Sequence, residues 1–114
     1  MVGKCTASEA LPVLLRLLKP AQMRRNEPEA VQLSACIGLG YYAHEEARHT
    51  LLQILHPRLL SRYRGKSDMV RAAAVTALGK QLPDIKAEKA IRIALTDNNP
   101  FVRQAAQQVL QQHV

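Results

Sequence analysis

The segment VRAAAVTALG, residues 70–79, decides the fold because two other segments of the chain repeat its pattern. Residues 31–40 read VQLSACIGLG, and residues 102–111 read VRQAAQQVLQ. In each segment a Val is followed by Ala four residues later and by Leu eight residues later, a spacing that places side chains on one face of a helix. The segments recur at spacings of 39 and 32 residues, which predicts a stack of helical repeats.

Each repeated segment follows another amphipathic stretch, so the chain is predicted to form six helices in three pairs. Pro20 and Pro83 each end a pattern, because proline cannot continue a helix. Pro28 and Pro100 stand where a helix begins, since a residue of the first turn needs no N–H donor. The predicted helices cover about 9–19, 28–43, 45–55, 68–82, 86–96 and 100–112.

The chain has room for one compact core, so we expect a single domain over residues 1–114. We predict an all-α fold, a short α-solenoid of about three antiparallel helix pairs. The pairs cover about 8–43, 45–82 and 86–113. Ser8 and Asp68 are the expected N-caps of the first and fourth helices, and Pro12 fits the first helix only if that helix begins close to Ser8.

The third pair carries a pattern that resembles the HEAT-repeat consensus. It consists of Asp97, Val102, Arg103, Ala106 and Leu110. Residues 68–79 resemble a second copy, and residues 9–18 are similar to the first helix of HEAT and armadillo units. The resemblance covers nearly the whole chain and implies a superhelical stack. HEAT arrays serve as scaffolds, transport receptors, lyase subunits and DNA-repair folds, so the resemblance leaves the function open.

The resemblance also implies a ladder between repeats, in which an Asp in the turn pairs with an Arg of the following helix. In this chain the two residues are Asp97 and Arg103. The first two pairs depart from the pattern, with Asn26 and Gln32 in the first and Gly65 and Arg71 in the second. The ladder is therefore expected to be partial.

The sequence contains no convincing arrangement of catalytic or metal-binding residues. His44 and His49 are five residues apart and not four, so they fall on different faces of a helix. His49 and His56 share a face, but no third ligand stands at a suitable spacing. There is also no Gly-rich loop that would hold a phosphate. We therefore expect a protein that is not an enzyme and uses no cofactor and no metal.

Basic residues gather in the links within the first two pairs. The formal net charge is +7, from 16 Lys and Arg against 9 Asp and Glu. In a stack the two links lie side by side, forming a basic edge that is either a solubilising rim or a site for phosphates or an acidic protein segment. The basic edge consists of Lys19, Arg24, Arg25, Arg58, Arg62, Arg64 and Lys66.

The second helix of the first pair offers a further candidate surface. Leu33, Cys36 and Ile37 are expected either to face away from the first helices or to pack against the second pair. Exposed, they would form an apolar inner face that receives a partner or another copy of the chain. The last helix is rich in Gln and is expected to be a capping repeat with a wet outer face.

These observations favour a non-catalytic protein-interaction module, a scaffold or an adaptor. Two alternatives stay open: binding of nucleic acid or another acidic ligand by the basic edge, and service as an accessory subunit of a HEAT-like lyase or modifying enzyme. Another protein is the expected partner, with homo-oligomerisation through the N-terminal repeat as a further option. Residues 1–8 lack a secretory signal and no apolar run is long enough to cross a membrane, so a cytoplasmic location without a membrane partner is expected, with Cys5 and Cys36 reduced.

Overall fold

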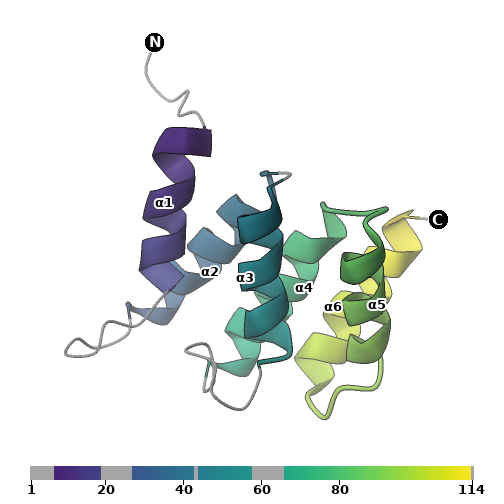
Figure 1. Cartoon of the computed structure of the whole chain (residues 1–114). Helices are drawn as coiled ribbons and strands as arrows, with labels where there is room; N and C mark the ends of the chain where they lie inside the picture. The colour runs from purple at the N-terminus through teal and green to yellow at the C-terminus, as the bar shows by residue number, and fades with distance from the viewer. Residues whose placement is uncertain (1–6, 19–26, 43, 58–65, 114) are drawn as a thin grey trace.

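The computed structural model describes residues 7–18, 27–42, 44–57 and 66–113. All regular secondary structure in these ranges is helical, which confirms the predicted all-α class (Figure 1). The helices are α1 (Ala7–Leu18), α2 (Glu29–Leu39), α3 (Glu45–Leu55), α4 (Asp68–Gly79), α5 (Ile85–Ala94) and α6 (Pro100–His113).

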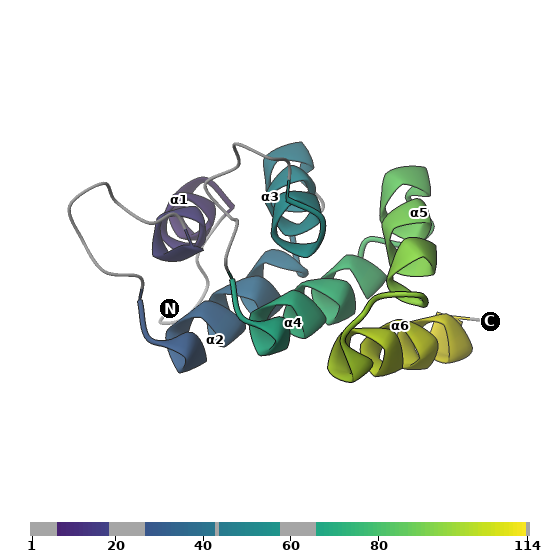
Figure 2. The same cartoon turned by 90° about the horizontal axis from the view of Figure 1, so that it is seen from below.

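The helices form two layers, as expected for a short α-solenoid. Helices α1, α3 and α5 lie in one layer, and α2, α4 and α6 lie in the other (Figure 2). We call α1 and α2 the first repeat, α3 and α4 the second, and α5 and α6 the third. Helix α4 packs against α2 on one side and α6 on the other, which makes it the centre of the stack.

The shared sequence pattern supplies much of the core. Its Ala residues, Ala35, Ala74 and Ala106, are at most 1% exposed and let neighbouring helices approach closely. The Leu residues of the first two repeats, Leu39 and Leu78, are fully buried, and so are Leu51 and Ile54 of α3 in the facing layer. The core is therefore one continuous apolar layer between the two sets of helices.

Helix α2 ends at Leu39, four residues earlier than predicted. The cause is a contact from the next repeat: the buried Gln81 side chain donates from Nε2 to the carbonyl oxygens of Gly40 (3.1 Å) and Tyr42 (2.9 Å). These carbonyls lie beyond the helix end and have no intrahelical partner. Helix α4 ends at Gly79, three residues before the predicted end at residue 82, and Gln81 lies just beyond it.

The predicted caps are shifted by one residue or more. Helix α1 begins at Ala7, so Ser8 lies inside the helix, and Pro12 also lies within it. Ser67, and not Asp68, caps α4: its Oγ accepts from the N–H of Val70 at 3.2 Å. Ser67 has the extended backbone that a capping residue needs, whereas Asp68 is already helical and its acidic side chain suits the first turn.

Two glycines allow successive second helices to approach closely. A Cβ added at Gly40 would lie 3.0 Å from Cα of Ala77 in α4, and one added at Gly79 would lie 2.7 Å from Cγ1 of Val109 in α6. The distance at Gly79 is shorter than real Cβ atoms show, and the distance at Gly40 is tighter than nine in ten real Cβ contacts, so a side chain at either position would force the packed helices to shift. None of the described helices has the length and apolar character needed to cross a membrane.

Candidate interaction surface

The outward side of α2, α4 and α6 forms a candidate surface that runs across all three repeats, which we call the second-helix face. Successive residues on it are separated by four, three and four positions, the spacing of one helix face. Its members are Ala30, Ser34, Ile37 and Tyr41 of the first repeat, Met69, Ala73, Thr76 and Lys80 of the second, and Phe101, Ala105, Gln108 and Gln112 of the third.

Large apolar side chains of this face are exposed to solvent. Ile37 is 45% exposed, Tyr41 70%, Met69 43% and Phe101 54%. Lys80 is the one charged residue among the members of the face, and its Nζ lies 4.8 Å from the centroid of the Tyr41 ring. That cation–π contact joins neighbouring repeats across the surface. A face with a single charged residue and with exposed aromatic and Met side chains has the character of a protein-binding surface.

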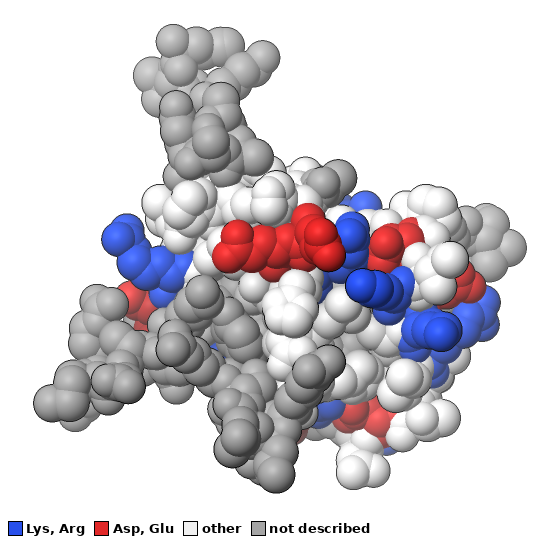
Figure 3. Space-filling view, viewed as in Figure 1, with Lys and Arg blue, Asp and Glu red and all other residues white. Residues whose placement is uncertain are grey.

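The opposite layer has a different character. Acidic side chains gather over α3 and basic side chains over α5 on the side of the molecule shown in Figure 3. The exposed charged residues there include Glu45 and Glu46 at the start of α3 and Lys86, Lys89 and Arg92 of α5. Ile85 and Ile93 are also exposed on this layer, but they stand among these charges. Helices α3 and α5 thus present a hydrated, charged surface on this side.

The three residues of the expected apolar inner face differ in their exposure to solvent. Ile37 is exposed and belongs to the second-helix face, whereas Leu33 is half-buried against the core and Cys36 is fully buried. This corrects the placement of Cys36, which packs inside the protein and is out of reach of a partner. The physical reason is that positions two and five after the shared Val turn toward the next repeat, so they are covered when α4 packs on α2.

Cys36 and Lys66 share the junction between the first and second repeats. Burial raises the pKa of the Cys36 thiol from 9.0 to about 12, although the charge of Lys66 acts in the opposite direction. Burial also lowers the pKa of Lys66, with a smaller opposing effect from Cys36. The Cys36 thiol is therefore protonated and sheltered, which does not suit a nucleophile or a metal ligand.

Only one residue of the basic edge, Lys66, lies in the part of the chain that the structure describes. Lys19, Arg24, Arg25, Arg58, Arg62 and Arg64 lie outside the residues that the structure describes. The seventh member, Lys66, is half-buried and donates from Nζ to Oε1 of Gln32 at 2.7 Å. Gln32 in turn donates from Nε2 to the carbonyl oxygen of Glu27 at 2.7 Å. Lys66 is thus engaged in joining the first two repeats.

A second polar contact joins the second and third repeats. Arg71 donates from Nη1 to Oδ1 of Asp97 at 3.2 Å and from Nη2 to Oδ2 of the same carboxylate. It also donates from Nε and Nη2 to the carbonyl oxygen of Leu55, at 3.3 and 3.2 Å. Arg103 meets Asp97 as well, but its Nη1 donates to the backbone carbonyl oxygen at 2.7 Å. The carboxylate of Asp97 therefore faces the preceding repeat.

The environment of Asp97 favours its charged form. Burial alone would raise the pKa of this carboxyl, but hydrogen bonds from Arg71 and from the N–H of Asn99, with the charges of Arg71 and His56, outweigh burial and lower it. The Asn99 side chain accepts from the N–H groups of Phe101 and Val102 and so caps α6. Asp97 and Asn99 together shape the turn that enters this helix.

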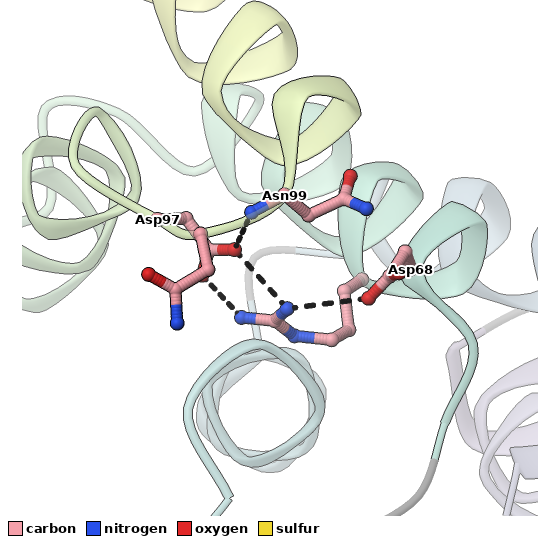
Figure 4. Close-up of a pocket in the computed structure, with 5 residues that line it drawn as sticks. Asp68, Asp97 and Asn99 are labelled. Atoms are coloured by element: carbon pink, nitrogen blue, oxygen red, sulfur yellow. Dashed lines mark hydrogen bonds and ion pairs between the residues drawn. The ribbon is translucent and has the colours of Figure 1, made fainter.

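The turn borders an open, polar hollow of about 380 Å³ (Figure 4). Arg71 lies between Asp97 and Asp68, whose Oδ1 is 3.6 Å from Nη1 of the same guanidinium. The lining residues are Asp68, Arg71, Asp97, Asn98 and Asn99. Arg71 is the one cation among the described lining residues, and two carboxylates already hold it, so the arrangement stabilises the repeat junction.

Two of the four histidines take structural positions. His44 caps α3, with Nδ1 accepting from the N–H of Glu46 at 3.1 Å. Nε2 of His56 lies 3.2 Å from the carbonyl oxygen of Ala90 in α5 and donates to it, because a carbonyl can only accept. Within the described ranges, no three His, Cys, Asp or Glu side chains come close enough together to hold a metal ion.

Reasoning from the sequence missed most of the second-helix face. The residues of this face stand one position before and three, six and ten positions after each shared Val. Ala105 is buried and Ala73 is half-buried, whereas the others are exposed, and only Ile37 is among the expected binding residues. The sequence did contain a signal for this face. Met69 and Phe101 occupy equivalent positions in two repeats, and large apolar side chains recurring at one surface position indicate a binding surface.

Comparison with known families agrees with this architecture. A model of HEAT repeats matches residues 57–113, half of the chain, and these residues contain α4, α5 and α6. No match was found among curated proteins or among solved structures. The matched region holds the turn, the capped helices and the Arg71–Asp97 contact that join successive repeats. The chain therefore belongs to the HEAT-repeat family.

Proposed function

We propose that this chain is a non-catalytic protein-interaction module, a scaffold or adaptor that binds a partner protein on the second-helix face. Repeats of the HEAT family generally mediate protein–protein interaction or scaffolding. The observation that carries the proposal is the exposure of Ile37, Tyr41, Met69 and Phe101 on a face where Lys80 is the single charge. Burying such side chains against a partner removes apolar area from water and so drives association.

The composition of the face also indicates the partner's chemistry. A strongly charged segment would lose hydration on this face and find only Lys80 to pair with, so the surface suits an uncharged segment with apolar side chains. Met69 and Phe101 lie on adjacent helices at equivalent positions, near the start of each helix, and offer neighbouring apolar anchors. The partner segment is expected to cross α4 and contact α2 and α6 on either side of it.

The proposal is tested by affinity capture with matched charge substitutions. The double variant Met69→Glu/Phe101→Glu places carboxylates on the second-helix face, and Ile85→Glu/Ile93→Glu places two on the opposite layer. The control residues are 71% and 59% exposed, compared with 43% and 54% for the residues of the face. Both variants should therefore fold, which circular dichroism checks.

We expect wild-type protein and the control to capture the same protein from nuclease-treated native extract, and the face variant to lose it. Equal capture by both variants would contradict the proposed surface. Recovery of nucleic acid alone from untreated extract, released by added salt, would instead support the basic edge as the binding site.

A further inference from the structure

Lys80 carries the one charge among the members of the second-helix face, and it lies beside an aromatic ring. Its Nζ is 4.8 Å from the centroid of the Tyr41 ring, and both side chains are exposed. The face of an aromatic ring attracts a cation but removes none of its charge. Lys80 therefore presents a full positive charge at a defined place on the surface.

No acidic side chain neutralises this charge among the residues that the structure describes. None of the ion pairs found there includes Lys80, and the segments outside the described ranges contain no Asp or Glu. Asp84, the acidic residue closest to Lys80 in sequence, is paired with Arg48 of α3 at 3.5 Å. Asp84 also accepts from the N–H of Ala87 and so caps α5. A bound partner can therefore supply the carboxylate that Lys80 lacks.

The place of Lys80 makes its charge matter for binding. Tyr41 is 70% exposed and is one of the side chains that carry the proposed function. A partner that covers the Tyr41 ring also removes water from the ammonium, because the two groups are in contact. Burying a charge without a counter-charge costs free energy, which would oppose binding. We therefore expect the partner to bring an anionic group to Lys80.

The neighbouring positions of the face suit a carboxylate. Tyr41, Lys80 and Gln112 each stand ten positions after the shared valine of their repeat, and each carries an N–H or O–H donor. No member of the second-helix face is acidic, so none of them repels an anion. Met69 lies eleven positions before Lys80, about 16 Å away along α4 at the rise of a helix. The face thus has an apolar end and a cationic end.

We propose that Lys80 is a specificity-determining residue of the second-helix face and pairs with one carboxylate of an otherwise uncharged partner segment. The inference rests on the proposed function and deepens it, because it adds the charge of the partner and its orientation. The apolar side chains of the partner lie toward the starts of α4 and α6, where Met69 and Phe101 are exposed. Its carboxylate lies at the end of α4, beside Tyr41. A segment with a basic residue at this point is repelled, so Lys80 discriminates against it.

Carbodiimide crosslinking tests the contact directly, because this reagent joins a lysine amine to an adjacent carboxylate through an amide bond. The reagent is applied to the complex that the chain captures from nuclease-treated native extract, and mass spectrometry identifies the joined peptides. We expect an amide between Lys80 and a carboxyl group of the captured protein. Lys80→Arg keeps the positive charge and should keep capture, but a guanidinium forms no such amide, so this crosslink should disappear.

Charge substitutions measure how much the contact contributes to binding. Lys80→Glu should weaken capture by about tenfold or more, because it places a carboxylate against the carboxylate of the partner. Lys80→Gln should weaken capture less, because it removes the attraction without adding repulsion. Lys89→Glu is the matched control: Lys89 is exposed on α5, and reversing its charge should leave capture unchanged. Circular dichroism checks that each variant folds.

The same experiment separates failure of this inference from failure of the proposed function. Capture that is lost in Met69→Glu/Phe101→Glu but is equal in wild type, Lys80→Gln and Lys80→Glu would overturn the role of Lys80 alone. A captured complex in which Lys80 forms no amide would also overturn it. Capture that is insensitive to Met69→Glu/Phe101→Glu would instead overturn the proposed binding surface, and this inference with it.

Discussion

The guanidinium of Arg71 holds the carboxylate of Asp97, so that the second repeat is bonded to the third through side chains with little access to water. The Arg71 side chain is 20% exposed and the Asp97 side chain 11%. The same guanidinium donates to the carbonyl oxygen of Leu55 at the end of α3. The Arg71 side chain therefore connects α4 to the end of α3 in its own repeat and to the turn of the next repeat.

Removing the acidic partner should destabilise the protein strongly. In Asp97→Ala the half-buried Arg71 charge keeps only the more distant and more exposed carboxylate of Asp68, which lowers the free energy of unfolding by about 2–3 kcal/mol. Urea denaturation followed by circular dichroism measures the change. The matched control is Glu88→Ala, which breaks the exposed Glu88–Arg92 pair and should change stability by less than about 0.5 kcal/mol. Equal effects of the two substitutions would contradict the structural role of Asp97.

The Asp97 contact should also make stability depend on acid pH. The pKa of Asp97 is lowered in the folded protein from 3.8, so the unfolded chain binds the proton more readily. The stabilisation is present above about pH 4 and is lost as pH falls toward the lowered pKa. Urea midpoints measured between about pH 6 and pH 2 should fall more steeply for the wild type than for Asp97→Asn. Parallel curves would show that Asp97 does not contribute to the acid transition.

Close approach of the second helices predicts that Gly40→Ala is destabilising. The new Cβ would lie 3.0 Å from both Cα and the carbonyl oxygen of Ala77, and backbone atoms cannot move aside as a side-chain end can. We expect thermal unfolding to show a loss of about 1–3 kcal/mol. Alanine normally favours a helix over glycine by about 1 kcal/mol, so a stabilised variant would contradict the close packing of α2 on α4.

Cys36 should resist thiol reagents in the folded protein. At mildly alkaline pH a pKa of about 12 instead of 9.0 leaves roughly a thousandfold less thiolate, and the side chain is fully buried. In a Cys5→Ser background, labelling with a disulfide reagent should be slow in buffer and immediate in denaturing urea. Rapid labelling of the folded protein would show that the Cys36 region of α2 is open to solvent.

The helices could be predicted from sequence because the signals that form them are local. Apolar spacing and prolines identified all six helices of the described ranges, and the recurring Val, Ala and Leu identified the stack. The end of α2 could not be predicted, because it depends on Gln81, a residue of the following repeat about forty positions away. Likewise, no local pattern shows that the Asp97 carboxylate faces Arg71 while Arg103 takes the backbone carbonyl.

The binding surface was harder to predict than the fold. Whether a helix position faces solvent or a neighbour depends on how far the next repeat is rotated, and a shift of one position exchanges a buried residue for an exposed one. Cys36 and Ile37 are adjacent in sequence, yet one is fully buried and the other is 45% exposed. Only the packed arrangement of α2, α4 and α6 in one layer (Figure 2) shows that the helices carrying Ile37, Met69 and Phe101 contribute to one face.

Site-specific photocrosslinking from the centre of the stack tests the proposed binding surface most directly. A photoreactive phenylalanine analogue at Thr76, an exposed residue of α4 on the second-helix face, is compared with the same analogue at Lys89, an exposed residue of α5 on the opposite layer. The account predicts that native extract yields a crosslinked protein from Thr76 and none from Lys89. A crosslink from Lys89 alone would contradict it.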